Sequence, residues 1–118
     1  MIIYAFDVDH TLDMSDGPVP LNAVVRLRTT SDVVLGLCGN WGVVTRTLPG
    51  WYEIFSFVGP MGIRKAEMLV EIRRYCPADD YVMVGNDPRL YGNSDDVGAA
   101  AEAGWRFIRE HDFAAGVR

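Results

Sequence analysis

The feature that most constrains the fold is a short apolar run that ends in two acidic residues. Residues 2–6, IIYAF, are apolar at every position, and Asp7-Val8-Asp9 follows. An apolar run without alternation is typical of a strand buried on both faces, as in a parallel sheet. Side chains two apart on an extended chain point the same way, so we expect Asp7 and Asp9 to leave this strand side by side. Adjacent carboxylates repel unless a cation lies between them, and the pair therefore predicts a site for Mg²⁺, which prefers oxygen ligands.

The rest of the chain alternates apolar runs with stretches at helical spacing. We expect strands at residues 2–7, 33–38, 54–58, 81–85 and 105–108, helices at about 21–28, 41–48, 64–75 and 95–103, and one helical turn within 110–118. Turn formers fill 13–20 and 86–94, which predict loops. Strands that alternate with helices predict an α/β fold, a three-layer Rossmann-like parallel sheet of about five strands with flanking helices and right-handed crossovers.

Length and composition narrow the class of protein. A chain of 118 residues with 49% apolar residues predicts a single domain, 1–118, with an ample core. The net charge of -5 gives no indication of a nucleic-acid partner. No apolar run reaches the length of a membrane span and no basic leader precedes the first strand, so we expect neither a membrane partner nor a signal peptide.

The two cysteines are too few for a disulfide framework, which favours the reducing cytoplasm. Cys38 ends a predicted strand, whereas Cys76 ends a helix about 18 Å long at 1.5 Å per residue. The two thiols should therefore lie at opposite edges of the sheet. Bridged cysteines need Cα atoms within about 7 Å, so we expect no disulfide.

Polar residues gather where the predicted strands end. In parallel sheets, ligands bind beyond the carboxyl ends of the strands. The residues found there are Asp7 and Asp9, Cys38-Gly39-Asn40, the only lysine of the chain, Lys65, and Asn86-Asp87. Together they predict an active site along one edge of the sheet.

These segments resemble, in order, the four motifs of the haloacid dehalogenase superfamily. Residues 7–12, DVDHTL, resemble the DxDxT motif of its phosphatases, and 33–40 resemble its second motif. Lys65 lies where the family places a lysine, and 84–88 with the helix from Asp96 resemble the fourth motif. The likeness covers nearly the whole chain and implies a small phosphatase-like member that requires Mg²⁺.

The resemblance implies a role for each acidic residue of the first motif. Asp7 would attack phosphorus to give an aspartyl-phosphate, which divides one difficult step into two. Asp9 would protonate the leaving oxygen and then activate water. Mg²⁺ would be bound by the Asp7 carboxylate, the Asp9 carbonyl, and an oxygen of Asn86 or Asp87.

The resemblance also implies the phosphate-binding groups. Lys65 would supply a fixed positive charge, because phosphoryl transfer depends mainly on positioning and charge neutralisation. The N–H groups near Gly39 and Asn40 would hold phosphate oxygens at a helix N-terminus. Thr11 would orient the loop that follows the first strand. Cys38 matches the Ser or Thr of the second motif, and it is either a phosphate contact or a buried core residue.

The sequence departs from the family pattern at two motifs. The thiol of Cys38 is a weaker donor than a hydroxyl. Asn86 stands where the family usually has Asp, and extra residues in 89–94 displace the next acids. Asp96 either orients Lys65 or a metal-bound water, or it is a plain helix-start acid, and Asp95 is interpreted as a charge at the helix N-terminus.

No cap domain fits between the motifs. Asp7 and Cys38 are 31 residues apart, and Asn40 and Lys65 are 25 apart, which the predicted helices and strand use up. An uncapped site is open, so we expect a phosphorylated substrate that is either large or enclosed by a second subunit. Substrate contacts from Arg89 and Tyr91, in the long fourth loop, complete this hypothesis.

Other functions stay open at this point. The two departures also fit a catalytically weak or inactive binding or scaffold protein on the same fold. A receiver-type signalling domain is disfavoured, because 52–60 contains no Asp and no lysine follows Lys65. Hydrolysis and phosphotransfer are not separated by these residues.

Overall fold

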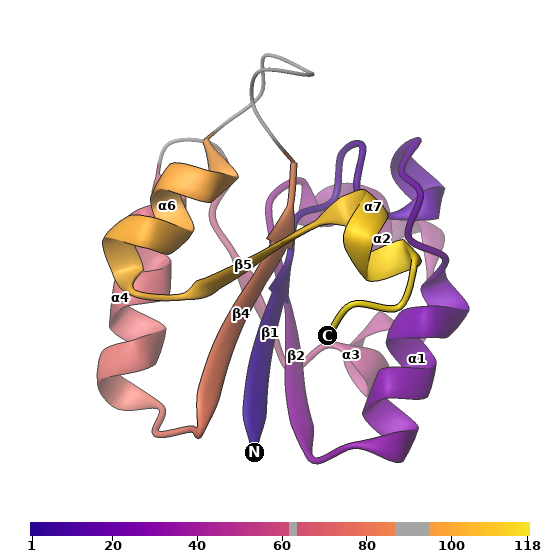
Figure 1. The fold of residues 1–118 in the computed structure, drawn as a ribbon. Coiled ribbons are helices and arrows are strands. Elements are labelled where there is room, and N and C mark those ends of the chain that lie inside the picture. The colour runs from indigo at the N-terminus through magenta and orange to yellow at the C-terminus, as the bar shows by residue number, and fades with distance from the viewer. Residues whose placement is uncertain (62–63, 87–94) are drawn as a thin grey trace.

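The computed structural model describes residues 1–61, 64–86 and 95–118. These residues form a parallel sheet with helices on both faces (Figure 1). Its five strands are β1 (Ile2–Phe6), β2 (Val33–Cys38), β3 (Phe57–Gly59), β4 (Asp80–Gly85) and β5 (Arg106–Arg109), in the spatial order β3-β2-β1-β4-β5. All neighbouring strands are parallel, which confirms the predicted Rossmann-like α/β fold.

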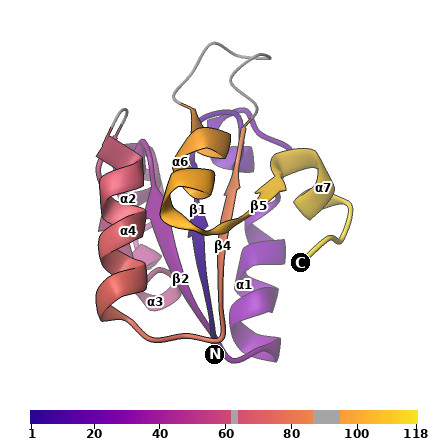
Figure 2. The same ribbon diagram turned by 60° about the vertical axis from the view of Figure 1, so that its left-hand side comes forward.

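The helices form the two outer layers (Figures 1 and 2). They are α1 (Leu21–Thr30), α2 (Trp41–Thr47), α3 (Trp51–Ile54), α4 (Lys65–Tyr75), α6 (Asp96–Ala103) and α7 (Glu110–Ala114), with a 3₁₀ turn, η1 (Asp13–Ser15). Helices α4 and α6 cover one face, where Leu69 and Ala100 pack on the sheet. Helices α1, α2 and α7 cover the other face, where Val24, Val44 and Phe113 are buried. None of the helices in the described ranges is long and apolar enough to cross a membrane.

Strand β1 is the centre of the sheet because its side chains are buried on both faces. Tyr4 and Phe6 point toward α7, and the Phe6 and Phe113 rings meet edge to face at 5.3 Å. Ile3 and Ala5 point the opposite way, into the core under α4 and α6. The continuous apolar run is thus explained by a strand with two buried faces.

The chain reverses its direction of travel across the sheet at β1. Strands β2 and β3 are added on one side of β1, and β4 and β5 on the other. Such a reversal leaves a crevice at the carboxyl ends of the central strands, where α/β proteins bind ligands. Asp7 continues β1 at this point and its N–H donates to the carbonyl of Val84 at 2.9 Å.

The third strand differs from the sequence prediction. The prediction placed it at 54–58, but residues 51–54 form α3, and β3 is confined to Phe57–Gly59. The N–H of Phe55 donates to the carbonyl of Trp51 at 2.9 Å, which ends a helical turn, and the Phe55 side chain is buried in the core. A short apolar run has no periodicity that separates a buried turn from a buried strand.

Other element boundaries differ from the prediction by one or two residues. Helix α1 runs to Thr30 rather than to residue 28, and the predicted loop 13–20 contains η1. Strand β5 begins at Arg106 rather than Trp105, whose indole N–H donates to the Leu69 carbonyl at 2.9 Å. The predicted turn in the tail is α7, and no further domain is inserted between the elements that the structure describes.

Candidate active site

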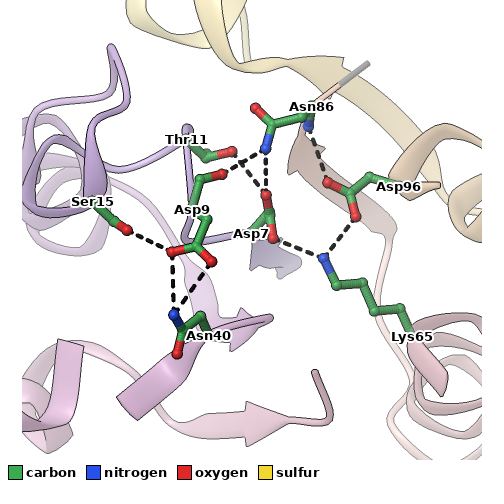
Figure 3. Close-up of polar contacts among 8 residues, drawn as sticks. All are labelled: Asp7, Asp9, Thr11, Ser15, Asn40, Lys65, Asn86 and Asp96. Atoms are coloured by element: carbon green, nitrogen blue, oxygen red, sulfur yellow. Dashed lines mark hydrogen bonds and ion pairs between the residues drawn. The ribbon is translucent and has the colours of Figure 1, made fainter. Parts of the chain in front are cut away.

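Asp7 is the centre of a network of buried polar residues at the carboxyl edge of the sheet (Figure 3). Its Oδ1 accepts from the Nζ of Lys65 at 2.7 Å. Its Oδ2 accepts from the Nδ2 of Asn86 at 2.6 Å and from the hydroxyl of Thr11 at 3.2 Å. Only 5% of Asp7 is exposed, so these three donors replace the water that a carboxylate normally binds.

Lys65 lies between two carboxylates. It is the first residue of α4, and its Nζ donates to Asp7 and to Asp96, at 2.7 Å in each case. Burial lowers the pKa of Lys65, but attraction and hydrogen bonds from both carboxylates outweigh burial and raise the pKa above its usual value. The two carboxylates therefore favour the positively charged form of Lys65.

Asp96 positions both Lys65 and the backbone of β4. Its Oδ2 accepts from the N–H of Asn86 at 3.0 Å, in addition to the Lys65 contact. A Cβ on Gly85 would lie 2.9 Å from the Asp96 Cβ, so only glycine allows this approach. Of the alternatives left open, the structure supports the orientation of Lys65. Asp95 is the N-cap of α6, where its side chain accepts from the N–H of Gly98 at 2.8 Å.

The environment of Asp7 disfavours its charge. Burial and the negative charge of Asp96 raise the pKa of Asp7, whereas Lys65 lowers it, and the net effect is a pKa of about 6. A carboxylate that is costly to ionise gains from a further cation close by. A further cation beside Asp7 would therefore favour its charged form.

Asp9 is more accessible than Asp7 and is held by a different pair of donors. The hydroxyl of Ser15 donates to Asp9 Oδ1 at 2.6 Å, and Nδ2 of Asn40 lies 3.3 Å from both carboxylate oxygens. Asn40 is the residue that precedes α2, but its side chain makes no cap bond because its amide turns toward Asp9. Ser15 was not predicted, since a serine in a turn-rich loop carries no distinguishing signal.

Asn86 connects the two acidic residues. It is fully buried, and Nδ2 donates to Asp7 Oδ2 and to the backbone carbonyl of Asp9, both at 2.6 Å. Its own Oδ1 is buried without a hydrogen-bond partner. Figure 3 shows this oxygen pointing away from Asp7 and Asp9.

The oxygen atoms near the Asn86 side chain are suitable ligands for a hard cation. Rotating the amide of Asn86 by half a turn would bring Oδ1 to the Asp7 oxygen and the Asp9 carbonyl, giving three oxygen ligands of the type that Mg²⁺ takes. Within the described residues, no three His, Cys, Asp or Glu side chains are grouped to hold a metal. Asp87, the other predicted ligand, and Arg89 and Tyr91, the predicted substrate contacts, lie outside the described residues.

The backbone of Gly39 lies close to the Asp7 carboxylate. It follows β2, and a Cβ built on it would lie 2.6 Å from Asp7 Oδ1 and 3.5 Å from Lys65 Nζ. A side chain at position 39 would collide with the Asp7 carboxylate, so only glycine allows the backbone to approach Asp7 this closely. Thr11, in contrast, is fully buried, and its hydroxyl orients Asp7.

Cys38 is a core residue in the structure. Its side chain is fully buried in the cluster that contains Ile3, Ala5 and Leu69, and burial raises the pKa of its thiol to about 12. A protonated buried thiol is a poor nucleophile. Cys76 is exposed and also free, which confirms the expectation of no disulfide.

The network brings together most of the residues that the sequence singled out. Asp7, Asp9, Asn40, Lys65, Asn86 and Asp96 come from five segments of the chain and are joined by hydrogen bonds. The chain matches no protein-family model, no curated protein and no solved structure. Its function is therefore argued from this site.

Proposed function

We propose that the chain is a Mg²⁺-dependent phosphate-monoester hydrolase that acts through an aspartyl-phosphate on Asp7. The observation that supports this most is the environment of Asp7, which has the Lys65 ammonium on one oxygen and the backbone of a glycine, Gly39, close beside that oxygen. The resemblance of 7–12 to the haloacid dehalogenase phosphatases assigns the same role to this residue.

In the first step, an Asp7 oxygen attacks phosphorus as the bond to the leaving oxygen breaks. Asp9 gives a proton to that oxygen, so the alcohol leaves neutral. In the second step, Asp9 takes a proton from water as the water oxygen attacks phosphorus, which releases inorganic phosphate and restores Asp7. Ser15 and Asn40 hold the Asp9 carboxylate in place through both steps.

Charge neutralisation is shared between Lys65 and the proposed metal. Lys65 stabilises the oxygens of the transferring group and the Asp7 carboxylate. Asp7, the Asp9 carbonyl and Asn86 would hold Mg²⁺, with Asp87 as a further candidate ligand, and the ion would neutralise phosphate oxygens. The rotated orientation of the Asn86 amide described above is compatible with this ligand set.

The substrate is proposed to be a large phosphorylated molecule, or a smaller one enclosed by a second copy of the chain. The elements described between Asp7 and Lys65 belong to the sheet or pack on it, and they leave the carboxyl edge of the sheet without a covering domain. The free thiols of Cys38 and Cys76 are compatible with the cytoplasm as the compartment. Phosphotransfer to an acceptor other than water uses the same first step.

A binding or scaffold function is the second candidate. It is favoured by Cys38, which is buried in the core and gives no hydroxyl to the phosphate site. A chain of this kind would bind phosphate or Mg²⁺ without turnover.

The experiment that tests the proposal is phosphate release from a generic aryl phosphate, with Mg²⁺ and with a chelator. The wild type is compared with Asp7→Asn, and Asp16→Asn is the matched control. Asp16 is exposed and has φ 63°, a left-handed conformation that Asn also accepts. Activity that requires Mg²⁺, is lost in Asp7→Asn and is kept in Asp16→Asn supports the proposal.

The negative outcomes separate the two candidates. A folded wild type that binds Mg²⁺ but releases no phosphate from aryl, sugar or protein phosphates supports the scaffold function. Activity that survives Asp7→Asn contradicts the aspartyl-phosphate mechanism.

A further inference from the structure

Glu110 is a buried carboxylate that the proposed mechanism does not use. It is the first residue of α7 and is fully buried, yet neither of its oxygens has a hydrogen-bond partner. Its Oε1 lies 3.6 Å from the Nε of Arg109 and 3.6 Å from the Nε2 of His111, which is beyond hydrogen-bond distance. Burying a carboxylate without hydrogen bonds is costly, and such a group calls for an explanation.

The sheet register places Glu110 beside Asn86. The last paired residues of β4 and β5 are Gly85 and Arg109, and Asn86 and Glu110 are the next residues of the two strands. Alternation places both side chains on the face where Val84 and Ile108, two residues earlier, are buried in one core. Neighbouring parallel strands are about 4.8 Å apart, so the two side chains lie within reach of each other.

The unpaired atoms of Asn86 and Glu110 share one property. Within the described residues, the buried side-chain oxygens and nitrogens that lack partners are Asn86 Oδ1, Glu110 Oε1 and Glu110 Oε2. All three are oxygens, and they belong to the two residues that directly follow the last paired residues of β4 and β5. The Asn86 amide has its donor toward Asp7 and Asp9 and its acceptor turned away from them (Figure 3).

In the present orientation the Asn86 amide turns its nitrogen, and not its oxygen, toward Asp7 and Asp9. When a cation is bound there, the opposite orientation of the amide is favoured. A half turn brings Oδ1 to the Asp7 and Asp9 oxygens, where a cation needs it. The same half turn carries Nδ2 to the side where Oδ1 now points. There the two N–H donors need an acceptor, and Glu110 has two that are unused.

We propose that Glu110 is a positioning residue for the metal site, which accepts a hydrogen bond from Nδ2 of Asn86 and so turns Oδ1 of Asn86 toward a bound Mg²⁺. This inference rests on the metal site of the proposed function and extends it to α7. Without the cation, Nδ2 of Asn86 bridges Asp7 and Asp9, as the structure shows. With the cation, Glu110 holds the amide in the reversed orientation.

The test is the dissociation constant for Mg²⁺, measured by calorimetry on the intact chain, together with the unfolding midpoint in chelator. Glu110→Met removes the acceptor and also a buried carboxylate that has no hydrogen bond. We expect Mg²⁺ to bind at least 10-fold more weakly, the usual effect of losing a group that orients a metal ligand, while the metal-free protein becomes no less stable. A merely structural Glu110 would change stability and leave the affinity for Mg²⁺ unaltered.

Two further variants isolate the proposed contact. Glu110→Gln keeps one acceptor oxygen of the same length, so we expect the dissociation constant to stay within about threefold of wild type. Asp112→Asn is the matched control, because Asp112 is exposed on the same short helix and the net charge changes equally. We expect no measurable change in affinity from it.

Asn86→Asp provides the decisive comparison. A carboxylate presents an oxygen in either orientation and needs no acceptor behind it. In the Asn86→Asp background, Glu110→Met should therefore not weaken Mg²⁺ binding. An equal loss in both backgrounds would overturn the proposal, because it would show that Glu110 does not act through the amide.

The outcomes are distinguishable from those for the proposed function. If the wild type binds Mg²⁺ with the stated dependence on Glu110 but releases no phosphate, the positioning role stands and the hydrolase function fails. If the wild type shows no Mg²⁺ binding, or Glu110→Met binds as tightly as wild type, the positioning role is overturned.

Discussion

Lys65 and Asp7 are 58 residues apart in the sequence and are joined by a 2.7 Å hydrogen bond. The bond ties the first residue of α4 to the end of β1. Asp96 accepts the second bond from the same ammonium group, so one lysine serves two buried carboxylates. This group of one lysine and two carboxylates carries a net negative charge in a buried site. A divalent cation would be stabilised there, and without one the buried negative charge is costly.

Replacing Lys65 tests this relationship directly. Lys65→Met leaves Asp7 and Asp96 buried without their cation, and breaking a buried pair in this way costs about 3–5 kcal/mol. We expect urea unfolding to show a loss of that size and phosphate release to be abolished. Arg64→Met is the control, since Arg64 is exposed and its ion pair with Glu67 is on the surface. A stability loss no larger than that of the control would contradict the role of Lys65 as the cation shared by the two acids.

Asp7→Asn should stabilise the metal-free protein at neutral pH. The folded-state pKa of Asp7 is raised to about 6 from an ordinary value of 3.8. The carboxyl group of Asp7 therefore contributes stability to the folded state that is complete below pH 3.8 and is lost as the pH rises through 6. The asparagine has no such cost, so at pH 7 the variant should be more stable by on the order of 2 kcal/mol.

The measurement is the unfolding free energy in chelator between pH 4 and pH 8. The advantage of Asp7→Asn should shrink toward pH 4, and saturating Mg²⁺ should reverse it, because the ion stabilises only the wild type. A variant that is less stable at pH 7 and no worse at pH 4 would show that Lys65 stabilises the charged form of Asp7 more than burial opposes it.

Ser15→Ala should impair catalysis without affecting Mg²⁺ binding. The Ser15 hydroxyl holds the Asp9 carboxylate at 2.6 Å, whereas the metal site would use the Asp9 backbone carbonyl. A hydrogen bond to a charged group contributes about 1.5–3 kcal/mol, which corresponds to a 10- to 100-fold lower kcat. Ser56→Ala is the control, because Ser56 is exposed and precedes β3, away from the carboxyl ends of the strands. An unchanged kcat would show that the hydrogen bond from Ser15 to Asp9 makes no contribution to catalysis.

The position of the site was predictable because it depends on few choices. Once 2–6 is a strand buried on both faces in a parallel sheet, Asp7 must end at the carboxyl edge, and the ends of β2 and β4 follow from the alternation of elements. The single lysine and its place at a helix start identified Lys65. The contacts of Asn40 and Ser15 with Asp9 depend instead on rotamers and on the path of 10–15, which no local pattern determines.

The errors in the fold prediction have the same origin. The apolar run at 54–58 fits a strand or a buried helical turn equally well, and only its packing in the folded core decides between them. The role of Cys38 was open because a strand-end residue faces either the rim or the core, depending on a register of one residue. Glu110 was overlooked because its distinguishing property is burial, which composition does not reveal.

The two cysteines should react very differently with alkylating agents. Burial raises the pKa of the Cys38 thiol to about 12, so almost none of it is thiolate at pH 8, and its fully buried position also blocks access. Cys76 is exposed at the end of α4. We expect iodoacetamide to modify Cys76 alone in the folded protein, as measured by mass spectrometry of the intact chain and its peptides. In urea both thiols should react at similar rates, and Cys76→Ser should leave a folded protein without detectable labelling. Labelling of Cys38 under native conditions would mean that the end of β2 opens to solvent, and the proposed phosphate site beside Gly39 would then not be preformed.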